Sequence, residues 1–347
     1  MQLQPKKIFN QDSGEDFLHS RVIGGNPTGI INFNQTNHNW ATDLFEKMEA
    51  RTWFTTQVSL AIDKVNYPKL SDADRRMYKL VLAQLISNDS IQTNQLMDGI
   101  NRYITSPAVN ACLAMQAKEE AVHSKSYAVM AETILQDDQQ EVYTLHMLDD
   151  ELSRKNDAVA AMYDNLYTGN DPSKEDLLMV FVANQVLEEL VFPGGFVAMH
   201  MLEHVMPGSS AMISEIQKDE TLSHVELFKN IFRTTIAEEF GGTVPDSVRI
   251  MAHKLIRDMT EAEIRWTLYA TEGVIGFTEK AITICVEEQA NSVCRNLMLP
   301  MLYEKRKDNP LRKILIDHLK DGNTSSRTSF FEKNVVEYSK NSLEIDF

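Results

Sequence analysis

Four long segments of this chain combine helical periodicity with acidic residues on their apolar side, and this combination most constrains the fold. In the segment EEAVHSKSY, Glu120, His123 and Tyr127 are spaced by three and four residues, so on a helix they share one face. Leu113 and Met130 extend the same stripe, which indicates that the face is directed into an apolar core. Burying a carboxylate and an imidazole is costly unless they are paired or bind a metal. The other segments must therefore supply a partner.

The remaining three segments repeat the pattern. One apolar stripe has Asp89 as its single charge, another contains Glu188, and a third has Glu220 and His224 four residues apart. Single carboxylates on two helices, with a carboxylate and a histidine on each of the other two, are the ligand set of a dinuclear metal site in a ferritin-like four-helix bundle. Four carboxylates balance the charge of two divalent ions. Oxygen-rich ligands with one imidazole per ion suit iron or manganese.

These observations predict an all-α fold, a ferritin-like helical bundle with the dinuclear site in its core. The helices are expected over residues 71–104, from the Ser-Pro pair at 106–107 onwards, over 174–192, from the Pro-Gly-Ser run at 207–209 to 239, and over 246–271 and 277–299. Pro193, followed by two glycines, should bend or interrupt the third of these.

The expected domain organisation has three parts. Residues 1–37 are rich in Asn, Gly and Gln and read as an N-terminal arm, and residues 38–320 form the helical domain. Residues 321–347 begin with the polar run DGNTSSRTS and read as a flexible C-terminal tail.

Composition narrows the class of protein. The net charge of −16 disfavours binding to nucleic acid or to anionic membranes, because phosphate surfaces repel such a chain. The three cysteines form neither a disulfide framework nor a CxxC zinc pattern, which favours a reducing cytoplasm. The start of the chain has no apolar run for a signal peptide. Residues 177–192 are apolar but are interrupted by amides and glutamates, so we expect no membrane span.

Single features of this kind are weak evidence. One Glu-x-x-His on a helix is more often a surface pair than a metal site, and it is the agreement of four helices that favours ligands. His200 and His204 also share a helix face, but no second carboxylate-bearing partner can be assigned to them, so they are interpreted as core or surface histidines. His146 lies in a polar stretch and is interpreted as part of a solvated face.

From about residue 20 to its last residue, the chain resembles the small, radical-generating subunit of class I ribonucleotide reductase. The segments that carry the resemblance are WFTTQVSLAIDKVNYPKL (53–70), NDSIQTN (88–94), EEAVHSKSY (119–127), LEELVFPGGF (187–196), KDETLSH (218–224), NLMLPMLYEKRKDNP (296–310) and FFEKNVVEYSK (330–340).

The resemblance implies a role for each matching residue. The metal ligands would be Asp89, Glu120 and His123 for one ion and Glu188, Glu220 and His224 for the other, with glutamates bridging. Tyr127 would bear the radical, and Phe192, Phe196 and Ile216 match the apolar pocket that shields it. Trp53 and Asp219 match a hydrogen-bonded chain from His123 to the surface, and Tyr338 matches the tyrosine that relays the radical equivalent to the large subunit.

The fourth helix departs from the family pattern. The family has Glu-x-x-His there, whereas this chain has Glu220 and His224 separated by three residues. The additional residue predicts a π-bulge, a feature often found at functional sites. It leaves open which of Asp219 and Glu220 is the ligand. Pro193, directly after the third-helix ligand segment, is a second departure.

The expected function is therefore that of a reductase small subunit, which makes a tyrosyl radical for a large catalytic subunit. We expect binding to that subunit through the C-terminal tail, a homodimer, and two metal ions. Tyr127 favours iron, although manganese or a mixed pair can use the same ligands. The alternatives are a ligand-binding oxidase or hydroxylase on the same bundle and a ferritin-like metal store. The tail argues against the first, and Tyr127 with Trp53 argues against the second.

Overall fold

The computed structural model describes residues 2–164, 171–306 and 309–320, and within these ranges every regular element is helical. The α-helices are α1 (Asn39–Ala50), α2 (Ala61–Asn66), α3 (Asp72–Asp98), α4 (Pro107–Met130), α5 (Glu141–Leu148), α6 (Asp150–Ala161), α7 (Lys174–Val186), α8 (Phe192–His200), α9 (Pro207–Asp219), α10 (Val225–Glu239), α11 (Asp246–Ala270), α12 (Glu279–Asn296) and α13 (Pro310–Leu319). Three π-helical turns are η5 (Ala131–Leu135), η8 (Leu187–Val191) and η9 (Glu220–His224). Short 3₁₀ turns are η1 (Phe17–His19), η2 (Thr55–Gln57), η3 (Tyr67–Lys69), η4 (Ile100–Arg102) and η6 (Gln136–Asp138). The predicted all-α fold is confirmed.

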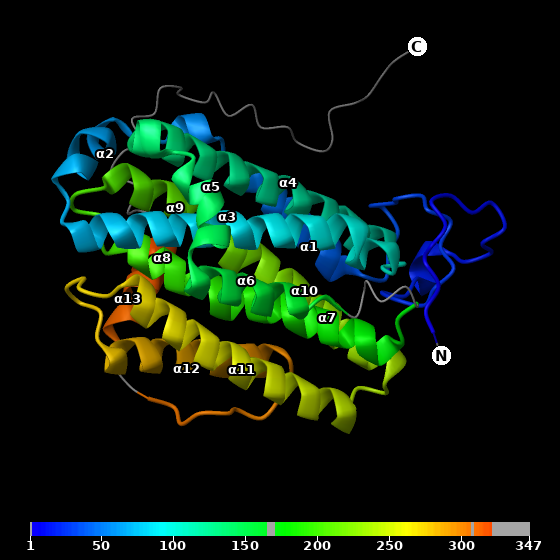
Figure 1. The fold of residues 1–347 in the computed structure, drawn as a ribbon. Helices are drawn as coiled ribbons and strands as arrows, with labels where there is room; N and C mark the ends of the chain where they lie inside the picture. Colours follow the sequence, from blue (N-terminus) through cyan, green and yellow to red (C-terminus); the bar gives the residue numbers. More distant parts are fainter. Residues whose placement is uncertain (1, 165–170, 307–308, 321–347) are drawn as a thin grey trace, which may run out of the picture.

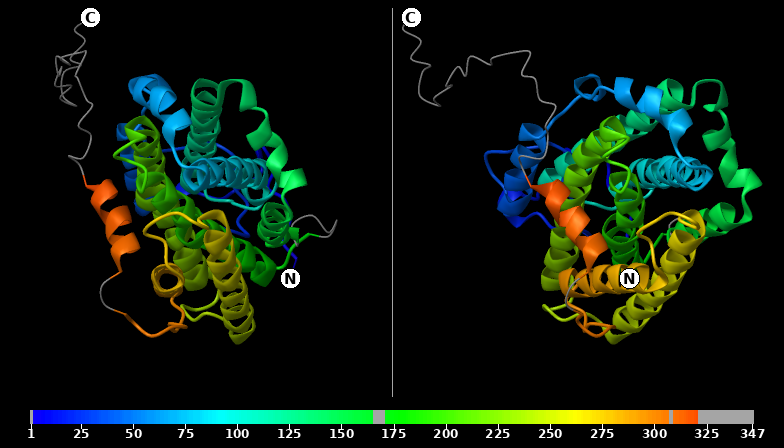
Figure 2. Two further views of the ribbon diagram at one scale, coloured as in Figure 1. Left: turned by 60° about the vertical axis from the view of Figure 1, so that its left-hand side comes forward. Right: turned by 90° about the vertical axis from the view of Figure 1, so that its left-hand side faces the viewer.

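Four long helical stretches form the centre of the molecule (Figure 1): α3, α4, the run α7–η8–α8 and the run α9–η9–α10. The helices α11 and α12 pack beside α7 and η8, and α13 packs across α8 and α9 (Figure 2). The four predicted apolar stripes all face inward. One member of each stripe illustrates this, since Tyr78, Leu113, Phe181 and Ile213 are all buried.

Side-chain caps explain where the core helices begin. The Ser71 hydroxyl accepts the Asp74 N–H at the start of α3, and the Ser106 hydroxyl accepts the Val109 N–H at the start of α4. The predicted first helix was too long, because α3 ends at Asp98 and the chain turns at Gly99 into η4.

The start of α9 is fixed by a neighbouring helix. The two Asp63 carboxylate oxygens accept the backbone N–H groups of Gly208 and Ser209. A side chain at position 208 would collide with the Ser59 carbonyl, so this close approach requires glycine. The contact anchors the helix that leads to Asp219 and Glu220.

Pro193 does not interrupt its helix. The chain stays helical from Lys174 to His200; the π turn η8 ends at Val191, and Pro193 is the second residue of α8. A proline cannot donate the N–H of an α-helical bond, and the wider turn before it is where the helix departs from α geometry. By length and composition this 27-residue stretch could cross a membrane, but 78% of its most apolar window is buried inside the protein, as is typical of a core helix.

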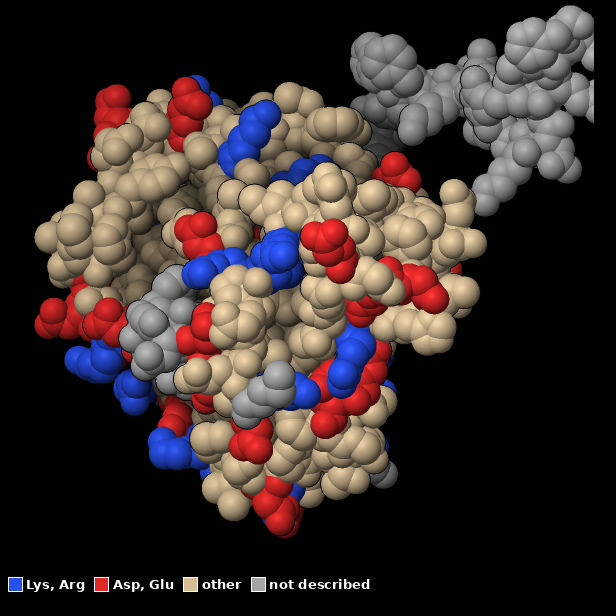
Figure 3. All heavy atoms as spheres, turned by 90° about the vertical axis from the view of Figure 1, so that its right-hand side faces the viewer, with Lys and Arg blue, Asp and Glu red and all other residues tan. Residues whose placement is uncertain are grey.

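The described part of the N-terminal arm, residues 2–37, lies against one end of the bundle (Figure 1). The Leu3 N–H donates to the Pro172 carbonyl, and the Thr105 N–H donates to the Val22 carbonyl. On the face that carries the arm, acidic and basic side chains are interspersed (Figure 3). The division into arm, domain and tail stays a prediction, and the tail at 321–347 lies outside the described residues.

Candidate metal centre

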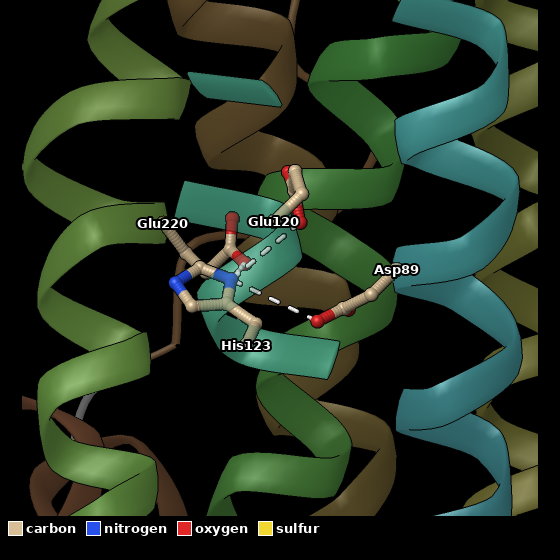
Figure 4. Close-up of side chains that lie close together, drawn as sticks. All are labelled: Asp89, Glu120, His123 and Glu220. Carbon is tan, nitrogen blue, oxygen red and sulfur yellow. Dashed lines mark ion pairs between the residues drawn. The ribbon is translucent and has the colours of Figure 1, made fainter. Parts of the chain in front are cut away.

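Six predicted ligands meet in the middle of the four-helix core. One group contains Asp89, Glu120, His123 and Glu220 (Figure 4); a second contains Glu120, Glu188, Glu220 and His224. Within each group the ligand atoms lie within 4.8 Å of one another, and every member is buried. Glu120 and Glu220 belong to both groups, which is the arrangement that two bridging carboxylates would have.

Both histidines direct Nδ1 towards this cluster. Nδ1 of His123 lies 3.1 Å from a Glu220 oxygen, 3.5 Å from Glu120 and 3.7 Å from Asp89. Nδ1 of His224 lies 2.6 Å from the other Glu220 oxygen, 3.3 Å from Glu120 and 3.8 Å from Glu188. Glu220 therefore lies between the two imidazoles.

The opposite nitrogen of each ring faces a second carboxylate. Nε2 of His123 lies 3.1 Å from Oδ2 of Asp219, and the same oxygen accepts the indole N–H of Trp53 at 2.7 Å. The Trp53 ring lies roughly parallel to the His123 ring, with centroids 6.5 Å apart. The predicted chain from His123 through Asp219 to Trp53 is thus present as hydrogen bonds.

The sequence reasoning missed Glu119. Its carboxylate lies 3.0 Å from Nε2 of His224 and is buried, so it serves this ring as Asp219 serves His123. The doublet Glu119–Glu120 is the only signal that could have pointed to it, matching the doublet Asp219–Glu220.

The predicted π-bulge is confirmed as η9, which spans Glu220 to His224. Glu220 and His224, four residues apart, contact each other within this wider turn, while Asp219, the residue directly before it, is directed to the outer side of His123. Geometrically, Glu220 joins the cluster and Asp219 does not.

Tyr127 is fully buried one turn after His123. Within the described residues its hydroxyl makes no hydrogen bond of ordinary geometry. Burial raises the pKa of this phenol well above its usual value, and the nearby carboxylates of Asp89 and Glu220 raise it further. The phenol is therefore neutral and close to the cluster. Phe192, Phe196 and Ile216 are buried too, and the two phenylalanine rings stack with centroids 5.9 Å apart.

The electrostatics of the cluster fit bound cations. Burial, followed by repulsion from Glu120, raises the pKa of Asp89, and burial followed by repulsion from Glu220 raises that of Glu188. Among the described residues, several buried atoms have no hydrogen-bond partner of ordinary geometry: both Asp89 oxygens, one oxygen each of Glu120, Glu188 and Glu220, and Nδ1 of His123. Unpartnered buried acceptors are costly unless a cation accepts their lone pairs. The donor set, four carboxylates and two imidazoles, fits two divalent ions.

The other predicted features fall elsewhere. His200 is a core histidine, with its ring nitrogens 2.9 Å from Ser210 Oγ and from Gln217 Oε1, and His204 is exposed. His146 is exposed as well, so both interpretations are confirmed. Tyr338 lies outside the described residues.

Comparison with known proteins identifies the family. The sequence profile of "Ribonucleotide reductase, small chain" matches residues 30–310. The chain belongs to the ribonucleotide reductase small-chain family. It is 32% identical to the ribonucleoside-diphosphate reductase subunit beta of Treponema pallidum, over 99% of this chain and 97% of the relative. A second relative, the subunit beta of Halalkalibacterium halodurans, is 25% identical over 100% of this chain and 99% of its own length.

Solved structures agree with this assignment. The ribonucleotide reductase R2 subunit from Clostridium botulinum matches with a TM-score of 0.86 and 25% identity, covering 92% of this chain and 100% of that one. The dimanganese(II) NrdF of Streptococcus sanguinis, at 19% identity, shares the fold with a TM-score of 0.72 over 84% of this chain and 99% of that one. The predicted resemblance, the ferritin-like fold and the oxidoreductase class are confirmed. The chain is a ribonucleotide reductase small subunit, of a family with a dinuclear iron or manganese centre and a large subunit as partner.

Proposed function

We propose that this subunit generates a radical at Tyr127 and stores it for ribonucleotide reduction by the large subunit. The ligands would be Asp89, Glu120 and His123 for one ion and Glu188, Glu220 and His224 for the other, with Glu120 and Glu220 shared. Two redox-active ions held this closely would activate oxygen and provide the oxidising power for the phenol. The observation that carries the proposal is the burial of a neutral phenol beside two ligand groups that have two carboxylates in common.

The protein's own residues would control the proton and electron of Tyr127. Oxidation of a phenol releases its hydroxyl proton, and the Asp89 carboxylate beside the Tyr127 hydroxyl would accept this proton. Burial keeps out water and small reductants, so the oxidised phenol would persist.

The path out of the site would be the chain from His123 through Asp219 to Trp53. Its hydrogen bonds of 3.1 Å and 2.7 Å allow a proton to shift as an electron moves. Trp53 is 5% exposed, so the chain ends just below the surface. From there Tyr338, in the tail 321–347, would relay the radical equivalent to the large subunit.

We assign iron as the preferred metal because the oxidisable residue is a tyrosine; manganese is the main competitor, because the same oxygen and imidazole ligands suit it. We also propose that the subunit forms a homodimer and is located in the cytoplasm.

Metal loading followed by electron paramagnetic resonance tests this function. The metal-free protein is supplied with Fe²⁺ and oxygen, or with Mn²⁺ and an oxidant, and the tyrosyl signal and metal content are measured together. A tyrosyl signal that disappears in Tyr127→Phe is expected. Two bound ions without any protein radical would contradict the proposal.

The role of the tail needs its own test. A truncation after Asp321 should keep the metal and the radical but lose turnover with the large subunit. A peptide of the removed residues should compete with the intact subunit. Full turnover by the truncated protein would exclude the tail as the docking segment.

A further inference from the structure

One helix of the core buries a row of amides that the ligand set does not explain. Gln84, Asn88, Gln92 and Gln95 lie along α3 at helical spacing, and each is at most 2% exposed. Asn184 on α7 and Gln116 on α4 are likewise fully buried. Burying an amide is costly unless it is hydrogen-bonded, so the hydrogen-bond partners of these amides are informative.

Two of these amides converge on one ligand. Nε2 of Gln116 donates to Oε1 of Glu188 at 2.9 Å, and Nε2 of Gln92 donates to the same oxygen. Gln116 also makes a longer hydrogen bond, of 3.4 Å, to Oε1 of Glu120. The donors come from α4 and α3, whereas Glu188 is on η8. The other carboxylate oxygen, Oε2, has no hydrogen-bond partner among the described residues and faces Nδ1 of His224 at 3.8 Å.

The orientation of Gln92 is itself determined by its neighbours. The Asn184 amide donates to the Val180 carbonyl, which turns its oxygen towards α3, where it accepts from Gln92 at 2.9 Å and from Gln95 at 2.7 Å. Gln95 also donates to the Gln92 oxygen at 3.0 Å. The Gln92 oxygen therefore points away from Glu188 and its NH₂ group points towards it.

Asp89, in the first ligand group, has no such support. Neither of its oxygens accepts a hydrogen bond of ordinary geometry from a described residue. Glu188 and Asp89, each of which belongs to one ligand group only, thus differ. One oxygen of Glu188 is held by two neutral amide donors, whereas no described amide donates to Asp89, which lies beside the Tyr127 hydroxyl.

From this asymmetry we propose that Gln92 and Gln116 are positioning residues that hold Glu188 as a one-oxygen ligand, with Oε2 presented to the ion beside His224. The inference rests on the proposed dinuclear centre. Occupying Oε1 with two N–H donors leaves one oxygen for the metal and removes the rotational freedom that the side chain would otherwise lose on binding. Neutral amides achieve this without the repulsion that a lysine or arginine would exert on a cation.

Manganese titration tests the inference without enzyme activity. Metal-free wild type, Gln92→Met and Gln116→Met are titrated with Mn²⁺, and the free ion is measured by electron paramagnetic resonance. Methionine keeps the length of the side chain but donates no hydrogen bond. Gln92→Met should weaken the binding of one of the two ions by roughly 10- to 100-fold and leave the other nearly unchanged. Gln116→Met should weaken the same ion most, with a smaller effect on the other, because Gln116 also donates to the shared Glu120.

Gln84→Met is the matched control. Gln84 is a fully buried amide on the same helix, but its oxygen accepts the Trp266 indole N–H at 2.5 Å and its amide faces the Val191 carbonyl, so it contacts no ligand. This variant should bind both ions as the wild type does, even if thermal unfolding shows it to be less stable.

The outcomes distinguish a failure of the positioning role from a failure of the dinuclear centre. If Gln92→Met and Gln116→Met bind both ions as tightly as the control, or lose both equally, the positioning role is wrong. If the wild type itself takes up fewer than two ions, the dinuclear centre fails instead. Because the two variants lie on different helices, misfolding of one leaves the other to decide.

Discussion

Nε2 of His123 lies 3.1 Å from Oδ2 of Asp219, while the next residue, Glu220, places its carboxylate 3.1 Å from Nδ1 of the same ring. Two adjacent acids thus contact opposite edges of one imidazole. An outer carboxylate holds the ring proton on Nε2 and leaves the Nδ1 lone pair for a metal ion. Glu119 and Glu120 stand in the same relation to His224.

This relationship predicts different effects for the two acids of the fourth helix. Glu220→Gln should abolish stoichiometric metal uptake, because it removes a carboxylate common to both ligand groups. Asp219→Asn should still take up two ions, with affinity reduced by about tenfold, but should lose turnover because the link to Trp53 is broken. Metal analysis and turnover with the large subunit decide this. If Asp219→Asn lost the metal and Glu220→Gln kept it, Asp219 would be the ligand and Glu220 would not.

Tyr127→Phe should separate metal binding from radical formation. The ring keeps its volume in the core, and because the hydroxyl makes no ordinary hydrogen bond among the described residues, stability should change by less than about 1 kcal/mol. Metal content should be unchanged, and activity with the large subunit should fall to background. Tyr78→Phe, at another buried tyrosine, whose hydroxyl contacts Ser209 and no ligand, is the control and should still form the radical at Tyr127. Normal turnover by Tyr127→Phe would exclude it as the radical site.

The ligand cluster could be predicted from sequence because each ligand interrupts an apolar stripe, and such an interruption on four helices rarely arises by chance. The π turn at η9 could be predicted as well, since Glu220 and His224 are one residue further apart than the family spacing. The roles of Glu119 and Gln116 could not be predicted from the sequence. A second glutamate or a glutamine on a helix acquires its meaning only from what the neighbouring helices place against it, and periodicity within one helix carries no such information. At Pro193 the helix is altered as expected, by the π turn η8 before it, but it is not interrupted, because it continues to His200.

Because of His200, which lies away from the metal centre, we expect the stability of the folded protein to decrease in acid. Burial, and then the nearby His318, lowers the pKa of His200 to about 3. The unfolded chain binds this proton at a pH near 6.5, so the folded state loses stability as the pH falls from about 6.5 towards 3. Between pH 7.5 and 5.5 the contribution to the free energy of unfolding should fall by about 1.4 kcal/mol.

Urea unfolding of the metal-free protein at these two pH values, compared with His200→Gln, isolates this effect from the titrating carboxylates. The variant should lose less stability on acidification than the wild type. Equal losses in both proteins would mean that His200 does not contribute.

The π turn at η9 gives the sharpest test of how the chain builds its site. Deleting Thr221 should convert η9 to an α-helical turn with Glu220 and His224 three residues apart, still on one face. Because the residue removed is the additional one of the wide turn, the helix on either side should keep its register, and metal uptake should persist. Deleting Thr234 in the regular helix α10 is the control: it rotates the following residues by about 100° and should destabilise the core. Metal titration and thermal unfolding of both deletions decide the matter. If removing Thr221 is as disruptive as removing Thr234, the π turn is not a separable insertion and the geometry of Glu220 depends on it.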